Sequence, residues 1–272
     1  MEPMDPHTHS NMSDGTCTPS LLVEKAKAAG LGIVALTDHD CIQGIPEAME
    51  AGERLGIRVI PGLELDTEFH TELHMLGLGV DPQHPALQEF AARNAQRRQA
   101  RNEAILNQLA AAGVDVRPFF PAQHGTPTRL HVALALVAGG FAPTIGEAFR
   151  NYLFRGTPGY VETKRILPED AIALIHQAGG LAVLAHPCKV KADVAALVAR
   201  LHPAGLDGLE AFYPTATPGQ RDTYISMAQQ YGMLLTCGSD FHGDNRPDNR
   251  LGCTWQQSPL LEPVYTWLLQ RS

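Results

Sequence analysis

The sequence has few cysteines, and they lack the spacing that holds a structural zinc ion. The five cysteines are odd in number and include no CxxC pair. Reduced thiols in a cytosolic protein are therefore expected, rather than a disulfide framework or a zinc finger. Cys41 and Cys188 adjoin motifs that are discussed below, but they are not expected to bind metal.

Long hydrophobic segments are also missing. No apolar run approaches the roughly 20 residues that span a bilayer, and the N-terminus has no basic segment followed by an apolar one. The sequence therefore predicts a cytoplasmic protein without a membrane partner.

Positive charge is in deficit, because 21 lysines and arginines face 29 aspartates and glutamates, for a net charge of −8. This balance argues against a broad nucleic-acid-binding surface, such as one for a DNA duplex. It is compatible with a local basic pocket for one phosphorylated ligand, and with acidic residues that are neutralised by bound metal.

What is present is an ordinary globular composition. Of the 272 residues, 44% are hydrophobic, and 25 glycines and 20 prolines indicate many turns. The length suits one large α/β domain, or a domain with an insertion. The sequence does not fix the oligomeric state.

A pattern of helix, strand and polar residue repeats along the chain. The alternation is typical of a parallel βα sheet or barrel, in which polar residues at the C-terminal ends of strands converge. No GxGxxG loop appears and the polar ends run from the first strand to the last, so a barrel is favoured over an open sheet. The predicted helices cover 21–28, 45–55, 168–178 and 218–231; the predicted strands cover 33–36, 57–60, 73–78, 181–185 and 234–236, and Pro61-Gly62 is expected to turn the chain after the second of these.

The middle of the chain differs, because the strand pattern fades there and helices are predicted over 86–112, 129–137 and 145–153. We interpret residues 83–158 as a helical insertion that covers the mouth of the active site, with residues 1–82 and 159–272 forming the barrel. The first of these helices carries Arg93, Arg97, Arg98 and Arg101, for which a solvated face and ligand binding are equally good readings.

Histidines and carboxylates gather at the predicted strand ends. His7 and His9 are two apart, so in a strand both can face one cation. A lone histidine such as His74 is more often a core residue, and a lone glutamate such as Glu64 is more often solvated. The metal site is predicted from the whole group of residues together. Six of the twelve histidines lie in or beside predicted strands, near carboxylates: His7, His9, His39, His74, His186 and His242.

Imidazole mixed with carboxylate suits Zn²⁺, Mn²⁺ or Fe²⁺, whereas an all-oxygen set would suit Mg²⁺ or Ca²⁺. Glu64 could bridge two ions, because a carboxylate offers two oxygens. Other histidines, such as His84, His124 and His202, lie in polar, loop-like surroundings and are expected to have no chemical role.

These motifs resemble the polymerase and histidinol phosphatase (PHP) family, in the family's order and over nearly the whole chain. The motifs are His7-Thr8-His9-Ser10, Ser13-Asp14-Gly15, Leu36-Thr37-Asp38-His39-Asp40, Gly62-Leu63-Glu64, His74-Met75-Leu76-Gly77, Ala185-His186-Pro187 and Gly238-Ser239-Asp240-Phe241-His242. The resemblance implies a metal-dependent phosphoesterase with a distorted seven-stranded (β/α) barrel. It also implies a cluster of two or three divalent cations, with Mn²⁺ favoured and Zn²⁺ or Fe²⁺ as alternatives.

The resemblance assigns ligands to three metal positions. Asp14 stands where some relatives have a histidine, which makes the second position more anionic and favours a harder ion such as Mn²⁺. The implied ligands are His7, His9, Glu64 and Asp240 for the first ion, Asp14, His39 and His242 for the second, and Glu64, His74 and His186 for the third.

Within the family, the insertion resembles the branch that acts on nucleoside 3′,5′-bisphosphates and related RNA ends. The resemblance implies phosphate binding by arginines, whose planar guanidinium can contact phosphate through two bonds. His186 or His131 would protonate the leaving group, and Phe212 with Tyr213 would either stack on a base or pack in the core. The implied substrate contacts are Asp40, Arg98, Arg101, Asn102, Arg129 and His131.

The implied reaction is hydrolysis of the 3′-phosphate of a nucleoside 3′,5′-bisphosphate by metal-activated hydroxide. The alternative substrates are a short RNA with a 5′-phosphate, degraded from 5′ to 3′, a cyclic phosphate and histidinol phosphate. A metal-dependent amidohydrolase and a non-catalytic, metal-stabilised module are the rival classes, because fold alone does not decide function.

Overall fold

The computed structural model describes residues 1–120, 125 and 127–271, so His124 lies outside the described residues. The chain divides into two compact units, one formed by Met1–Ala91 with Arg165–Ser272 and the other by Ala92–Lys164. The predicted insertion, 83–158, overlaps the second unit, and its role as a cover stays a prediction. Among the described residues, no helix combines the length and apolar character needed to cross a membrane.

The first unit is built on a seven-stranded sheet whose strands follow one another in chain order. Neighbouring strands are parallel, except that β4 is antiparallel to both β3 and β5. The strands are β1 (Met4–Thr8), β2 (Ile33–Leu36), β3 (Arg58–Asp66), β4 (His74–Leu78), β5 (Leu181–Leu184), β6 (Gly208–Phe212) and β7 (Leu234–Cys237).

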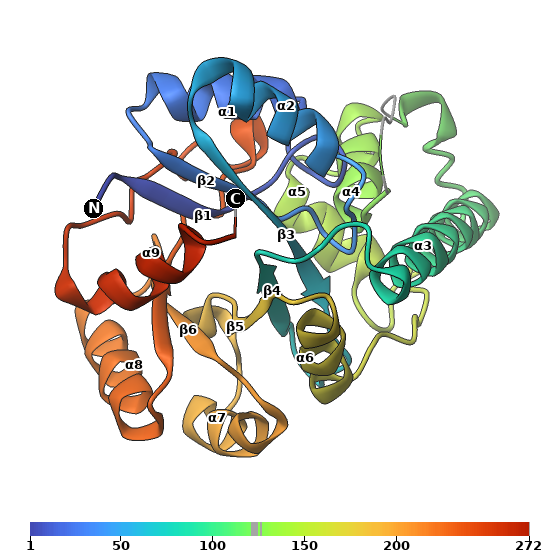
Figure 1. Cartoon of the computed structure of the whole chain (residues 1–272). Helices are drawn as coiled ribbons and strands as arrows, with labels where there is room; N and C mark the ends of the chain where they lie inside the picture. Colours follow the sequence, from blue (N-terminus) through green and yellow to red (C-terminus); the bar gives the residue numbers. More distant parts are fainter. Residues whose placement is uncertain (121–124, 126, 272) are drawn as a thin grey trace. The chain divides into compact units, whose positions relative to one another are not determined.

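The sheet curls, and its helices lie on the outside of the curl (Figure 1). Thr8 of β1 forms an isolated parallel bridge with Phe241, in the segment that follows β7, so the two edges of the sheet approach each other there. The fold is therefore α/β with a curled, mixed sheet, and the continuous closure of the predicted barrel stays a prediction. The helices of this unit are α1 (Pro19–Ala28), α2 (Ile45–Leu55), α6 (Pro168–Gln177), α7 (Val194–Leu201), α8 (Pro218–Tyr231) and α9 (Glu262–Leu268).

Local sequence explains where these helices begin and end. Thr18 and Thr217 cap α1 and α8 through their side chains, and a proline follows each of them. Gly56 and Gly232 end α2 and α8 in the left-handed conformation that glycine adopts without strain. The helices that we predicted over 45–55 and 218–231 are confirmed.

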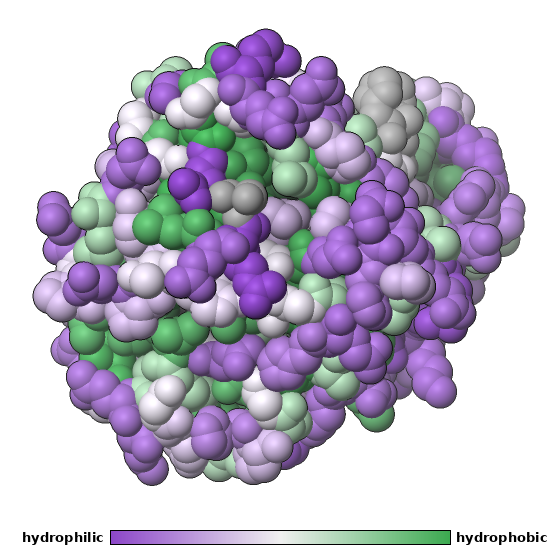
Figure 2. Space-filling view, in the orientation of Figure 1, coloured by the Kyte–Doolittle hydropathy of each residue, from purple (hydrophilic) through white to green (hydrophobic). Residues whose placement is uncertain are grey.

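The core of this unit lies between the sheet and the helices around it. All four residues of β2 and all four of β5 are buried, as expected for strands covered on both faces. Burying a leucine or isoleucine side chain contributes about 1.5–3 kcal/mol, so this core holds the strand ends in place. The surface in Figure 2 is mostly hydrophilic, with scattered hydrophobic patches.

The predicted Pro61-Gly62 turn is wrong, because β3 continues through both residues. The strand changes partner at this point: residues 58–61 pair with β2, and residues 62–66 pair with β4. Gly62 permits the change, since a Cβ there would lie 2.8 Å from the carbonyl oxygen of Gly77. The longer strand carries Glu64 within the sheet.

The second unit is helical and has a small core of its own. Its helices are the greater part of α3 (Pro85–Ala111), then α4 (Arg129–Ala138) and α5 (Ile145–Ala148), which continues into a π-helical segment, Phe149–Leu153. Leu109, Val132 and Leu136 are fully buried in that core. The helix predicted over 145–153 is therefore an α-helical segment followed by a π-helical one.

Candidate metal centre

One edge of the curled sheet collects the histidines and carboxylates that the sequence singles out. They come from the C-terminal ends of the parallel strands, where the chain leaves the sheet. His74 comes from the start of β4, which is the same edge because β4 is antiparallel. His7 and Glu64 lie within β1 and β3, and the residues that follow strands are His9 after β1, His39 after β2, His186 after β5, and Asp240 and His242 after β7.

Glu64 lies at the centre of this cluster and is only 1% exposed. Its Oε1 is 2.8 Å from His186 Nε2 and 2.9 Å from His74 Nδ1. Its Oε2 is 3.2 Å from His9 Nε2 and 3.3 Å from His39 Nδ1. Burial alone would raise the pKa of this carboxyl group, but the surrounding histidines hold it well below its usual range.

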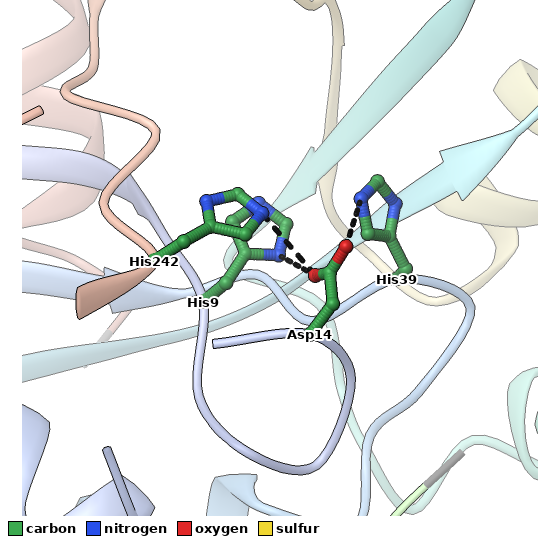
Figure 3. Close-up of side chains that lie close together, drawn as sticks. All are labelled: His9, Asp14, His39 and His242. Atoms are coloured by element: carbon green, nitrogen blue, oxygen red, sulfur yellow. Dashed lines mark ion pairs between the residues drawn. The ribbon is translucent and has the colours of Figure 1, made fainter. Parts of the chain in front are cut away.

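Asp14 forms a second focus of the cluster, because His9 and His39 approach its carboxylate as well as that of Glu64. Its Oδ1 is 3.2 Å from His242 Nε2 and 3.9 Å from His9 Nδ1, and its Oδ2 is 3.8 Å from His39 Nε2. In Figure 3 the carboxylate lies between His39 on one side and His9 with His242 on the other. These four buried groups offer ligand atoms that all lie within 4.8 Å of one another.

The structure brings together all nine residues that we predicted as metal ligands. The first predicted set, His7, His9, Glu64 and Asp240, forms one group within the same 4.8 Å limit. The second predicted set, Asp14, His39 and His242, is joined by His9 within the same limit. In the third group His39 joins Glu64 and His74, while His186 contacts the same Glu64.

The donor set fits divalent cations. His9 Nδ1 and His186 Nδ1 are buried without a hydrogen-bond partner in the described part of the chain, although buried polar atoms normally have one. Asp40, His186 and Asp240 have positive φ angles of 50°, 28° and 53°. Non-glycine residues in that conformation cost about 1–3 kcal/mol and concentrate at functional sites.

The charges of the histidines differ across the cluster. Burial lowers the pKa of His9, but hydrogen bonds to Asp240 and Glu64 outweigh it and raise the pKa to about 9. Burial also lowers the pKa of His74, but the negative charges of Glu64 and Asp66 outweigh this effect and raise the pKa to about 9. At neutral pH the metal-free cluster therefore holds protons on these two rings, and a cation would displace them.

We expect the affinity for Mn²⁺ to increase between about pH 6.5 and 9, because metal must compete with protons on His9 and His74. Both folded pKa values lie above the unfolded value, so these protons stabilise the metal-free fold fully below about pH 6.5 and cease to do so as the pH rises through 9. Calorimetric Mn²⁺ titrations at pH 7.5 in two buffers of different ionisation enthalpy should reveal proton release. Equal heats in the two buffers would contradict this expectation.

Two carboxylates near the cluster received no role in the sequence analysis. Asp66 Oδ1 is 3.1 Å from His39 Nδ1; it follows Glu64 by two residues on β3, and this same-face spacing is the signal that could have identified it. Glu210 Oε1 is 2.8 Å from His7 Nδ1, a contact that fixes the orientation of the ring. Glu210 lies in β6, but its partner is 203 residues away in the sequence, so no local pattern indicates this contact.

The loop that carries Asp14 is anchored by Asp38. The backbone N–H and hydroxyl of Ser10 donate to Asp38 over 2.8 and 2.6 Å, and the hydroxyl of Ser13 donates over 2.5 Å. The three residues of the charged triplet Asp38-His39-Asp40 therefore have different roles. Asp38 holds the loop, His39 joins the cluster, and Asp40 accepts a hydrogen bond from the backbone N–H of Asp66 over 3.1 Å.

Three of the predicted substrate contacts in the second unit, Arg101, Asn102 and His131, form hydrogen bonds with one another or with Thr128. Arg98, Arg101 and Asn102 are buried. Arg101 donates to Asn102 Oδ1 over 3.0 Å, and Asn102 donates to the carbonyl oxygen of Thr128 over 3.2 Å. His131 Nδ1 accepts from the backbone N–H of Thr128 and so completes a capping box at α4, in which Arg129 is the first residue.

Phe212 and Tyr213 are both buried, with 3% exposure each. Tyr213 donates its hydroxyl to Asp240 Oδ2 over 2.6 Å, and its ring meets the ring of His186 edge-on at 5.4 Å. Tyr213 therefore supports the cluster itself, a role that neither base stacking nor simple core packing describes.

Comparisons with known proteins agree with this geometry. The model of the family described as the PHP domain matches residues 5–185. A 5′-3′ exoribonuclease, Rnm, of Salmonella typhimurium is 38% identical over 88% of this chain and 84% of that protein. A 3′,5′-nucleoside bisphosphate phosphatase of Chromobacterium violaceum is 32% identical over 100% of this chain and 98% of that protein.

A solved structure from Chromobacterium violaceum, described as an amidohydrolase with bound sulfate and no metal, has a similar fold. The TM-score is 0.87 at 32% identity, and the match covers 99% of this chain and 96% of that one.

Proposed function

Because the chain belongs to the PHP-domain family of metal-dependent phosphoesterases, we propose that it hydrolyses a phosphomonoester of a small nucleotide, preferably the 3′-phosphate of a nucleoside 3′,5′-bisphosphate. The observation that carries the proposal is the convergence of His7, His9, Glu64 and Asp240 within 4.8 Å. The likeness to a bisphosphate phosphatase over the full length of both chains supports the choice of substrate.

We propose the predicted ligands as the metal-binding residues, with His9 added to the second position and His39 to the third. Imidazole and carboxylate donors in this mixture suit Mn²⁺, Zn²⁺ or Fe²⁺, and Asp14 favours Mn²⁺. When bound, two or three such cations would activate a water molecule and polarise the phosphoryl oxygens. The residues of the chain then have to orient the ester, hold its charge and supply a proton to the leaving oxygen.

We keep both His131 and His186 as proposed candidates for the leaving-group acid. The Nδ1 of His131 accepts from the backbone N–H of Thr128 over 3.0 Å, so the neutral ring carries its proton on Nε2. The pKa of His186 is lowered by burial and by the charges of Lys189 and His74, which suits a neutral ligand better than an acid. We keep Asp40, Arg98, Arg101, Asn102 and Arg129 as proposed substrate contacts.

A 5′-3′ exoribonuclease acting on short 5′-phosphorylated RNA is the second candidate, favoured by 38% identity to such an enzyme. We expect the Mn²⁺-loaded protein to release phosphate from a nucleoside 3′,5′-bisphosphate with a higher kcat/KM than for the same nucleoside 3′-phosphate. A short 5′-phosphorylated RNA, a cyclic phosphate, histidinol phosphate and a set of amides complete the panel. Faster turnover of the RNA would select the second candidate, and turnover of amides alone would reject both.

A further inference from the structure

The two carboxylate oxygens of Asp240 face different surroundings. Oδ1 faces the histidine cluster and lies 3.4 Å from both His9 Nε2 and His242 Nδ1. Oδ2 accepts from the hydroxyl of Tyr213 over 2.6 Å, from Lys189 Nζ over 3.1 Å, and from the guanidinium of Arg246. One oxygen atom thus gathers a phenol and two cations.

Both cations reach solvent, although the carboxylate they share is buried. The side chains of Lys189 and Arg246 are 31% and 35% exposed, whereas that of Asp240 is 2% exposed. Asp240 also faces His7 and His9 on its other side. Two solvent-accessible cations therefore lie directly beside the candidate metal ligands.

Lys189 is placed by the loop that follows β5. It ends the 3₁₀ turn Pro187–Lys189, which begins immediately after His186. Its ammonium group lies 5.0 Å from the centre of the Tyr213 ring, a cation–π distance. The lysine is thus held beside the cluster by the same tyrosine that anchors Asp240.

Arg246 is placed by the loop that follows β7. Its neighbours fasten this loop to the cluster, because Asn245 Nδ2 donates to the carbonyl oxygen of Asp14 over 2.8 Å and Asn249 Nδ2 donates to that of Asp240 over 3.2 Å. The planar guanidinium can contact two oxygens of one phosphate, which an ammonium group cannot do.

We infer that Lys189 and Arg246 form a phosphate-binding pair, which shifts from Asp240 Oδ2 to the phosphoryl oxygens of the substrate. The inference rests on the proposed phosphoesterase function, and it places part of the substrate's recognition in the same unit as the metal ligands. A phosphoryl group carries enough negative charge to use both cations, and Tyr213 remains to hold Asp240 Oδ2 when they leave. No group is transferred in this step.

The test is the affinity of the Mn²⁺-loaded protein for inorganic phosphate, measured by calorimetry. We expect Lys189→Met and Arg246→Met each to raise the Kd for phosphate by about 10- to 100-fold, the usual effect of losing a charge-assisted hydrogen bond. Lys189→Arg should restore most of the affinity. Lys191→Met and Arg250→Met remove exposed cations from the same two loops and should leave the Kd at the wild-type value.

Tyr213→Phe separates phosphate binding from the anchoring of Asp240, because it removes a donor to Oδ2 without removing charge. If the cations merely anchor Asp240, then Lys189→Met, Arg246→Met and Tyr213→Phe should all lose bound Mn²⁺, and their Kd for phosphate at equal metal content should match that of the wild type. That result would overturn the inference. Where a methionine variant fails to fold, the glutamine variant at that position replaces it. If the wild type hydrolyses the ester but has the same Kd for phosphate as Lys189→Met and Arg246→Met, the phosphate-binding pair is refuted and the proposed function is not. If the wild type hydrolyses no phosphoester, the proposed function is refuted.

Discussion

Replacing Glu64 by alanine should lower kcat/KM on the preferred phosphoester by about a thousandfold or more. The carboxylate contacts five histidines at distances between 2.8 and 3.4 Å, more than any other residue of the cluster that the structure describes. Its loss removes a ligand from two of the three proposed metal positions at once. We expect the bound metal, measured by elemental analysis, to fall with the activity.

Glu72→Gln is the matched control for this experiment. Glu72 also approaches His74, at 3.8 Å, but its side chain is 60% exposed, and it belongs to none of the ligand groups. Its removal should change kcat/KM by only a few-fold, because an exposed ion pair contributes about 1 kcal/mol or less. Both variants should unfold in one cooperative transition. Substantial turnover of a bisphosphate by Glu64→Ala would defeat the assignment.

The residues that gather in the cluster could be predicted because their signals are local. An apolar run followed directly by Asp38-His39 indicates a charged group at a strand end, where it needs water, a partner or metal. Asp240-Phe241-His242 gives the same indication at β7. Since the C-terminal ends of parallel strands meet at one edge, such signals could be combined without knowledge of the strand order.

Strand direction and partner choice were not predictable in this way. An apolar run such as residues 73–78 reads the same in a parallel or an antiparallel strand, and β4 proves to be antiparallel. Pro61-Gly62 has the composition of a turn, and the sheet overrides that local preference by pairing Pro61 with Leu36 and Gly62 with Leu78. Tertiary contacts decided both features.

The supporting residues of the centre escaped prediction for a related reason. Lys189 and Arg246 lie in irregular loops, where residue type and spacing carry no periodic signal. Their common partner, Asp240, is 51 residues from Lys189. Only the packing of β5 against β6 and of β6 against β7 brings the two loops to one carboxylate.

Chelation should abolish hydrolysis, and of the divalent cations added back, Mn²⁺ should restore it best. The second metal position combines three imidazoles with the carboxylate of Asp14, which makes it more anionic than an all-histidine set and favours a harder ion. The measurement is the rate with a bisphosphate after removal of metal and addition of Mn²⁺, Zn²⁺, Fe²⁺ or Mg²⁺. Activity that ignores chelators would contradict the metal-dependent reaction.

Asp14→His tests the reason for that preference. The variant replaces the oxygen donor between His9, His39 and His242 with a fourth imidazole, which suits Zn²⁺ better than Mn²⁺. We expect the ratio of Mn²⁺-restored to Zn²⁺-restored activity to fall relative to the wild type. An unchanged ratio, with metal bound at wild-type stoichiometry, would show that residues other than Asp14 set the preference, because the substitution changes the charge of this position and leaves the other predicted ligands in place.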